Sequence, residues 1–251
     1  MDQLSAKRRI VALTGKDALP FLQGLVSNDV LPLARSAGLV WTALLSPQGK
    51  YLADFFVVST GSELLIDLPE VVADSTLQRL AMYRLRADVA WRPSALGVQR
   101  GIGVAPQGAL ADPRHPDLGW RLYGSTAADQ EVDWDDIRVR NLIPEAGIEL
   151  IPGESYLLET GFERLHGVDF RKGCYVGQEV TARMRHKTEL RKGLVRVRVS
   201  TPVPPGTAIL ADGKEAGTLW TQSGGLGIAY LRFDRAQADL MAGPARVTVA
   251  D

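Results

Sequence analysis

The sequence predicts an α+β fold, with mixed antiparallel sheets and helices in two subdomains, followed by a small C-terminal β-barrel or sandwich. In the first half, strand-like apolar runs are joined by turns rich in Pro and Gly, such as SPQGK at residues 46–50, which is typical of antiparallel hairpins. Strand-like and helix-like segments do not alternate regularly, which argues against a doubly wound parallel sheet. From Leu190 onward, short strands and turns follow one another without a helix.

The first hundred residues contain two predicted helices and six predicted strands. The segment 15–29 is a predicted helix, with Asp17 as its cap and Pro20 in its first turn. A second helix is predicted over residues 68–87, with Leu85 among its inward-facing side chains. The predicted strands are residues 8–13, 39–45, 51–58, 63–67, 88–91 and 97–104.

The next segments lead to a predicted boundary between two domains. Residues 106–119 are rich in Pro, Gly, Asp and Ala and are predicted to form a loop. Short helices are predicted within 132–147, where acidic residues suit the first turn, and over 177–187. The change to a purely strand-like pattern places the boundary near residue 188. The two predicted domains are residues 1–188 and 189–251.

Composition places the chain among ordinary soluble globular proteins, with 45% hydrophobic and 23% charged residues and a formal net charge of zero. A zero net charge gives no reason to expect a nucleic-acid or membrane partner. The single cysteine excludes a disulfide within the chain, as is typical of a reducing compartment. MDQLSAKRRIVALTG at the N-terminus lacks an apolar signal-peptide core, and no apolar run approaches the roughly 20 residues that span a bilayer. We therefore expect a cytoplasmic protein without a membrane segment.

Charge is distributed unevenly along the chain. Residues 111–163 hold twelve acidic and four basic residues, a local net charge of −8, whereas residues 171–198 hold nine basic and two acidic residues, a net charge of +7. A charge run is most often a solvated face, but this basic stretch also suits an anionic ligand or partner. The basic stretch contains the only cysteine, which makes it the first candidate for a site.

That cysteine lies in the segment FRKGCYVGQEV at residues 170–180. Gly173 and Gly177 bracket Cys174 and permit a positive φ or a close backbone approach. The neighbouring Lys172 and the N-terminus of the helix predicted next both favour the thiolate over the thiol. A buried structural cysteine is the alternative, and the residues alone favour the reactive and structural roles about equally.

The chemistry open to a lone thiol is limited by its potential partners. A cysteine hydrolase needs a positioned histidine, and His115, His166 and His186 are present, but sequence spacing does not join any of them to Cys174. A resident metal centre is not expected, because zinc and iron–sulfur sites need several ligands of this kind. Cys174 could supply one ligand in a complex with a partner, or act transiently on a substrate thiol or persulfide.

KGCYVGQE at residues 172–179 resembles the signature of the YgfZ-type folate-binding proteins, whose mitochondrial relatives act in iron–sulfur protein maturation. FLQGLVSNDV, LIPEAGIEL and SYLLETGFERLHGVDF are similar to further blocks of that family in the same order, so the resemblance spans nearly the whole chain. This family is a branch of the superfamily of the glycine-cleavage aminomethyltransferase, or T-protein. The resemblance implies a ring of three subdomains around a channel that accepts tetrahydrofolate, and it implies that the C-terminal unit is a β-barrel.

The resemblance also implies roles for particular residues. Asp54 matches the catalytic aspartate of the aminomethyltransferases, Glu159 the glutamate that contacts the pterin, and Asn28 a block near the folate. A carboxylate such as Glu159 can accept a pair of hydrogen bonds from the pterin edge. The residues alone favour plainer roles, with Asp54 as a strand-end acid, Glu159 as a solvated acid and Asn28 as a helix C-cap. The remaining implied site residues belong to the signature of this branch: Lys172, Cys174, Gln178 and Glu179.

Three functions are compatible with these features. The resemblance favours a tetrahydrofolate-binding accessory protein for the assembly or repair of iron–sulfur proteins, including enzymes that modify tRNA, with Cys174 as the reactive thiol. The alternative is a folate-dependent aminomethyl or one-carbon transferase that uses Asp54, although the chain is shorter than such enzymes usually are and carries a cysteine signature that they lack. The third is a non-catalytic module that docks a partner through the basic stretch. The expected partners are folate and iron–sulfur proteins or their assembly machinery, without a membrane or direct nucleic-acid contact.

Overall fold

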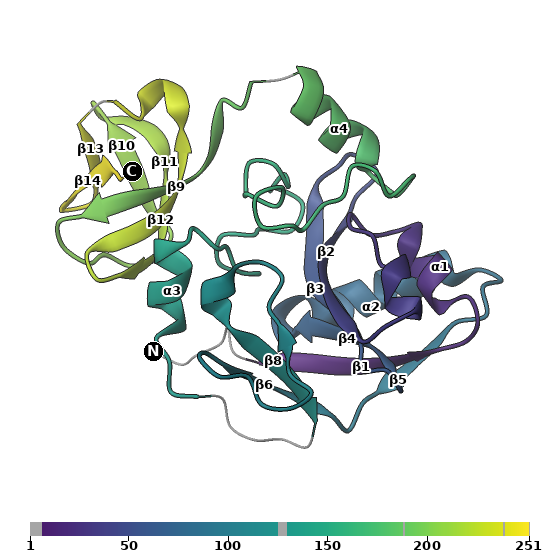
Figure 1. Ribbon diagram of the computed structural model, residues 1–251. Coiled ribbons are helices and arrows are strands. Elements are labelled where there is room, and N and C mark those ends of the chain that lie inside the picture. The colour runs from purple at the N-terminus through teal and green to yellow at the C-terminus, as the bar shows by residue number, and fades with distance from the viewer. Residues whose placement is uncertain (1–6, 125–129, 188, 238, 251) are drawn as a thin grey trace.

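The computed structural model describes residues 7–124, 130–187, 189–237 and 239–250, and Figure 1 shows their arrangement. The first unit is an antiparallel five-stranded sheet in the order β2-β3-β4-β1-β5. Its elements are β1 (Arg8–Thr14), α1 (Ala18–Gln23), η2 (Leu31–Ala34), β2 (Gly38–Leu45), β3 (Tyr51–Ser59), β4 (Leu64–Pro69), α2 (Glu70–Arg84) and β5 (Ala90–Pro93).

This sheet is buried on both faces because its strands alternate between two apolar clusters. In β3, Phe55 and Val57 pack in the cluster that contains side chains of α1 and α2, whereas Phe56 and Val58 belong to a cluster on the other face. Successive side chains of a strand point to opposite faces, so a strand buried on both sides has a nearly continuous apolar sequence.

A second, smaller sheet in the order β6-β8-β7 adjoins the first. Its elements are β6 (Gly97–Gly101), β7 (Leu110–Ala111), η3 (Pro116–Leu118) and β8 (Trp120–Gly124), and they are followed by α3 (Trp134–Arg140). The chain then runs as turns from residue 141 to residue 177, where α4 (Gln178–Lys187) follows. Apolar side chains from these turns cover the face of the first sheet opposite α1 and α2, and they are Ile143, Leu150, Leu157, Phe162 and Leu165.

The C-terminal strands close into a barrel in the order β10-β11-β12-β9-β14-β13, drawn in light green and yellow in Figure 1. Their bounds are β9 (Lys192–Val199), β10 (Thr207–Ala211), β11 (Lys214–Ser223), β12 (Leu226–Arg232), η4 (Phe233–Arg235), β13 (Leu240–Ala242) and β14 (Ala245–Val249). The buried Glu149 ties the barrel to α3, because its carboxylate accepts hydrogen bonds from Arg138 at 2.6 Å and from the Thr221 hydroxyl.

The predicted fold class is confirmed, and the differences have physical causes. The helix predicted over 15–29 ends at Gln23, because Val26 and Ser27 pair with the backbone of β2 instead. Leu85 follows the end of α2 with a φ of +44° and is 88% exposed, so it is not a core residue. The predicted strand 97–104 ends at Gly101.

Two further expectations concern the domain boundary and membranes. The boundary predicted near residue 188 falls on a residue outside the described ranges, so the division into 1–188 and 189–251 stays a prediction. None of the helices in the described part of the chain has the length and apolar composition needed to span a membrane.

Candidate functional site

Cys174 is exposed on the loop that leads into α4, and this loop is anchored on the turn between β2 and β3. Gly177 and Gly49 face each other there with φ values of +81° and +73°. A Cβ on Gly177 would lie 2.5 Å from the carbonyl oxygen of Ser46, so the contact requires glycine. Tyr175, next to the thiol, is buried in the core. The sulfur is therefore exposed on a backbone that is held on its C-terminal side.

Lys172 fixes the other side of the loop to the end of α1. Its Nζ donates to the carbonyl oxygen of Gln23 at 2.5 Å, and the Gln23 side-chain amide donates to the Lys172 carbonyl at 3.2 Å. Burial lowers the pKa of Lys172 to about 8, and electrostatic interactions with Asp29, Asp169 and Cys174 oppose that shift. The ammonium group of Lys172 thus interacts electrostatically with Cys174.

The last two signature residues have local roles in the structure. The Gln178 side-chain oxygen accepts a hydrogen bond from the backbone N–H of Tyr175 at 3.2 Å, which closes the turn around the thiol. Glu179 pairs with Arg183 across one turn of α4 at 2.9 Å, as their spacing predicts, and both side chains are largely exposed. Gln178 therefore positions the loop, whereas Glu179 lies on the surface.

Asp54 is buried in β3 with both carboxylate oxygens engaged. They accept hydrogen bonds from Trp41 Nε1 at 2.8 Å and from the Tyr51 hydroxyl at 2.7 Å. Trp41 stacks on Phe162 with ring centroids 4.1 Å apart. Burial, reinforced by the Asp54 carboxylate, raises the pKa of Tyr51 well above its usual value, so this hydroxyl remains a donor. Asp54 is therefore not the solvated strand-end acid that the residues alone favoured.

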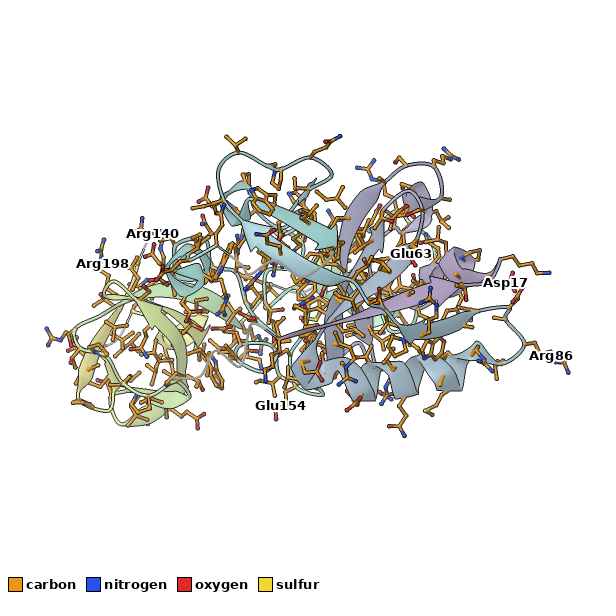
Figure 2. The ribbon with its side chains drawn as sticks, turned by 90° about the horizontal axis from the view of Figure 1, so that it is seen from below. Asp17, Glu63, Arg86, Arg140, Glu154 and Arg198 are labelled. Carbon is orange, nitrogen blue, oxygen red and sulfur yellow. The ribbon has the colours of Figure 1, made fainter. Side chains whose placement is uncertain are left out.

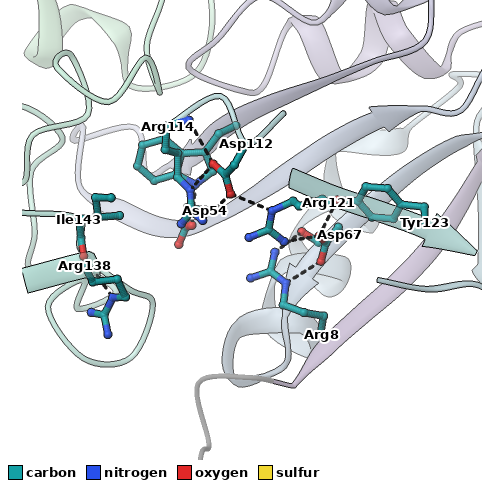
Figure 3. Close-up of polar contacts among 10 residues, drawn as sticks. Arg8, Asp54, Asp67, Asp112, Arg114, Arg121, Tyr123, Arg138 and Ile143 are labelled. Carbon is teal, nitrogen blue, oxygen red and sulfur yellow. Dashed lines mark hydrogen bonds and ion pairs between the residues drawn. The ribbon is translucent and has the colours of Figure 1, made fainter. Parts of the chain in front are cut away.

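A narrow cavity beside Asp54 is lined by several arginines, most of them paired with carboxylates, and Figure 3 shows most of its charged groups. Glu145 also lines it, and burial raises the pKa of that carboxyl. The arginines that line it, among the residues described, are Arg8, Arg100, Arg114, Arg121 and Arg138.

Two buried aspartates connect three of these arginines. Asp67 lies 2.6 Å from Arg8 and 3.2 Å from Arg121, and Asp112 lies 2.9 Å from Arg121 and 2.8 Å from Arg114. Burial alone would raise the pKa of both carboxyls, but the guanidinium groups outweigh it and hold both values below the usual range. Sequence reasoning missed this network, because each of its members looks like an isolated surface charge along the chain.

Glu159 is buried near a large cleft, so it is not the solvated acid that the residues alone favoured. Its carboxylate accepts a hydrogen bond from the Tyr230 hydroxyl of β12 at 2.5 Å. Burial, followed by the contact with Glu159, raises the pKa of Tyr230 well above its usual value. Tyr230 lines a cleft of about 630 Å³ between the 149–155 turns and the barrel, together with basic Lys192 and Arg232.

Asn28 does not cap a helix, because α1 ends at Gln23. Its side-chain amide donates to the carbonyl oxygens of Trp41 at 2.8 Å and His166 at 2.7 Å. Asn28 therefore joins β2 to the turn that follows Phe162, at the edge of a shallow groove.

The structure brings some of the expected site residues together and separates others. Lys172, Cys174 and Gln178 share one loop, but Cys174 does not line the cavity at Asp54 or the cleft at Tyr230. In the described ranges, no cluster of three or more His, Cys, Asp or Glu side chains could hold a metal ion. The basic stretch is also divided between the loop before α4, α4 itself and β9.

Comparisons with known proteins agree with this architecture. Residues 191–251 match the family model described as the CAF17 C-terminal β-barrel domain. The crystal structure of the glycine cleavage system aminomethyltransferase T from Bartonella henselae superposes with a TM-score of 0.75 at 10% identity, covering 97% of this chain and 82% of that one. This likeness shows the fold, and the predicted relation to the aminomethyltransferase fold is confirmed.

Curated relatives identify the family. The mitochondrial iron–sulfur cluster assembly factor IBA57 of Homo sapiens is 31% identical over 93% of this chain and 78% of its own length, and that of Mus musculus is 30% identical over the same shares. The mitochondrial location in the names of these relatives contradicts the cytoplasmic location expected from the sequence. A single cysteine indicates only a reducing compartment and cannot distinguish between such compartments. The narrower YgfZ-type assignment stays a resemblance. With this identity over nearly its whole length, the chain belongs to the IBA57 family of iron–sulfur cluster assembly factors.

Proposed function

We propose that this chain is an iron–sulfur cluster assembly factor in which Cys174 is the working thiol. The observation that carries the proposal is the exposure of the only thiol on a loop that is fixed on both sides, by Lys172 and by Gly177. The names of the relatives support the cluster as cargo. Cys174 would lose its proton to solvent and take the coordination position of a ligand that the iron releases, without a change in oxidation state.

One cysteine cannot hold a cluster alone, which defines the kind of partner. Iron–sulfur clusters are usually held by several cysteine thiolates, so the remaining ligands come from a partner protein that presents its own cysteines. Exposure of Cys174 on a loop before α4 leaves the sulfur accessible to such a partner.

The test is complementation of a strain that lacks this gene. We expect Cys174→Ala to fold normally and to fail to restore cluster-enzyme activities, including that of a cluster enzyme that modifies tRNA. Met82→Ala is the matched control, since Met82 is another sulfur side chain that is 70% exposed. Full restoration of all activities by Cys174→Ala would remove the thiol from the mechanism.

We further propose that tetrahydrofolate binds in the cleft beside Glu159 and Tyr230. Glu159 lies behind Tyr230, which lines the cleft, and its carboxylate suits the donor edge of a pterin that reaches it. Lys192, Arg232 and Arg235 suit the anionic glutamate tail of folate, and Glu149, Glu154 and Glu215 line other parts of the same cleft. The protein's part is to orient the ring with Glu159 and to hold the tail with its basic side chains.

Folate binding can be tested independently of cluster chemistry. Trp220 lines the cleft, so its fluorescence should change as tetrahydrofolate is added. We expect Glu159→Gln to weaken binding about tenfold, as for loss of a charge-assisted hydrogen bond. An unchanged affinity, or no binding by the wild type, would refute the folate site and leave the role of Cys174 standing.

One-carbon transfer by Asp54 is the second candidate. It is favoured by the fixed carboxylate of Asp54 at the edge of an arginine-lined cavity. Formation of methylene-tetrahydrofolate from an aminomethyl-loaded carrier protein, lost in Asp54→Asn, would establish this activity. Failure of the wild type to turn over would eliminate it.

A further inference from the structure

A groove on the junction between α3 and the barrel has no part in the functions proposed above. It has a volume of about 430 Å³ and lies where the end of α3 meets β9 and β14. Arg140, Arg164, Arg196 and His115 supply its charged and titratable side chains. Figure 2 labels Arg140 and Arg198 on this side of the molecule, pointing outward.

The groove is basic without a matching set of acids. Among the residues described, its lining includes no carboxylate. Of the nearby acids, Asp136 pairs with Arg140 at 2.9 Å, and Asp117 accepts a hydrogen bond from Asn141 at 2.9 Å and lies 3.8 Å from His115 Nδ1. In the described ranges, neither Arg164 nor Arg196 has an ion-pair partner.

Backbone carbonyls hold these two guanidinium groups in place. Arg164 donates to the carbonyl oxygens of Asn141 at 3.0 Å and Leu142 at 2.6 Å, and Arg196 donates to that of Arg140 at 2.6 Å. These contacts satisfy the carbonyls at the end of α3, which is a structural role. A guanidinium has more N–H donors than these contacts use, so the same side chains can also bind a ligand.

One donor in the groove is buried without an acceptor. Arg196 Nε has no hydrogen-bond partner among the described residues, and capping α3 does not explain it. A buried donor without a partner is costly, and an acceptor atom placed there would remove that cost. Burial also lowers the pKa of Arg164, which is the expected response of a cation without a nearby carboxylate.

His115 lies at the edge of the groove, and its Nδ1 accepts a hydrogen bond from the backbone N–H of Asp117 at 3.2 Å. We propose that this groove binds the phosphate or carboxylate group of a small molecule through Arg164 and Arg196. Guanidinium groups bind both kinds of oxyanion through paired N–H donors.

The test is titration of the full chain with inorganic phosphate, and separately with acetate, by calorimetry at constant ionic strength. We expect binding of at least one of the two anions in the millimolar range. Tighter binding of phosphate would assign a phosphorylated ligand, and tighter binding of acetate a carboxylate; both outcomes support the site. Absence of binding by either anion would overturn it.

Variants separate a built site from general attraction to positive charge. Arg196→Gln should weaken binding about tenfold or more, as loss of a charged hydrogen-bond donor does. Arg198→Gln is the matched control, because Arg198 lies two residues further along β9 and outside the groove, and should weaken binding less than about twofold. Arg164→Gln provides a second site variant if Arg196→Gln does not fold. Equal effects of the site and control variants would contradict the proposal.

Discussion

Replacement of Gly177 by alanine tests whether the close backbone contact holds the thiol loop. The new methyl group would lie 2.5 Å from the carbonyl oxygen of Ser46 and 2.9 Å from Cβ of Leu45, at a φ of +81°. Both neighbours belong to the β2–β3 hairpin and its buried end, so neither can move freely. Gly177→Ala therefore combines backbone strain with a steric clash.

Gly173 provides an internal control on the other side of Cys174. Its φ is +95°, and a Cβ there would meet no atom within 4 Å. Gly173→Ala thus carries backbone strain alone, about 1–2 kcal/mol. Gly177→Ala carries the same strain, and overpacking adds about 1–3 kcal/mol.

Thermal unfolding followed by circular dichroism measures this difference. For a chain of this size, 1 kcal/mol shifts Tm by about 2–4 °C, so Gly177→Ala should melt about 2–12 °C below Gly173→Ala. Equal Tm values would mean that the loop is not packed on the β2–β3 turn as the structure has it.

Three further predictions concern charge and exposure. The lowered pKa of Lys172 means that the unfolded chain binds more protons than the folded chain between pH 8 and 10.5. The unfolding free energy of the wild type, relative to that of Lys172→Met, should therefore rise across that window. Urea titrations measure it, and a difference between the two proteins that does not change with pH would contradict the shift. Asp67→Asn should cost about 3–5 kcal/mol of unfolding free energy, because it removes the buried carboxylate that Arg8 and Arg121 share, and Arg121 then keeps only Asp112. Asp74→Asn on the surface should cost less than about 1 kcal/mol, and similar costs for the two variants would refute the buried network. Iodoacetamide should alkylate Cys174 in the native chain without denaturant, and a requirement for urea would show that the thiol is covered.

Local sequence pattern predicted elements whose signal lies within a few residues, and it failed where distant segments compete. The strand predicted at 51–58 is β3 almost to the residue, because its apolar run and its turn signal are adjacent. The helix predicted over 15–29 stops early because Val26 forms a bridge with Leu44, a partner that short-range spacing cannot reveal.

The same distinction applies to the candidate sites. Glycines and charges around Cys174 are neighbours in sequence, so the sequence could suggest an accessible thiol. The arginine cavity could not be predicted, since Asp67 is 59 residues from Arg8 and 54 from Arg121. Its short-range signals are the alternation of Arg121 and Tyr123 in β8, both bonded to Asp67, and the neighbouring pair of Asp112 and Arg114.

The β2–β3 hairpin is the element that the thiol loop shares with the two cavities. Its turn, at Ser46 and Gly49, contacts Gly177. In β3, which follows the turn, the Tyr51 hydroxyl donates a hydrogen bond to Asp54. The Tyr51 backbone N–H donates to Ser155, which lines the cleft beside Tyr230. A ligand in that cleft would therefore lie beside Ser155, whose carbonyl is bonded to the strand that follows the turn supporting the loop of Cys174. The alkylation rate of Cys174 with and without tetrahydrofolate measures this connection, and an unchanged rate under saturating folate would mean that the thiol and the cleft act independently.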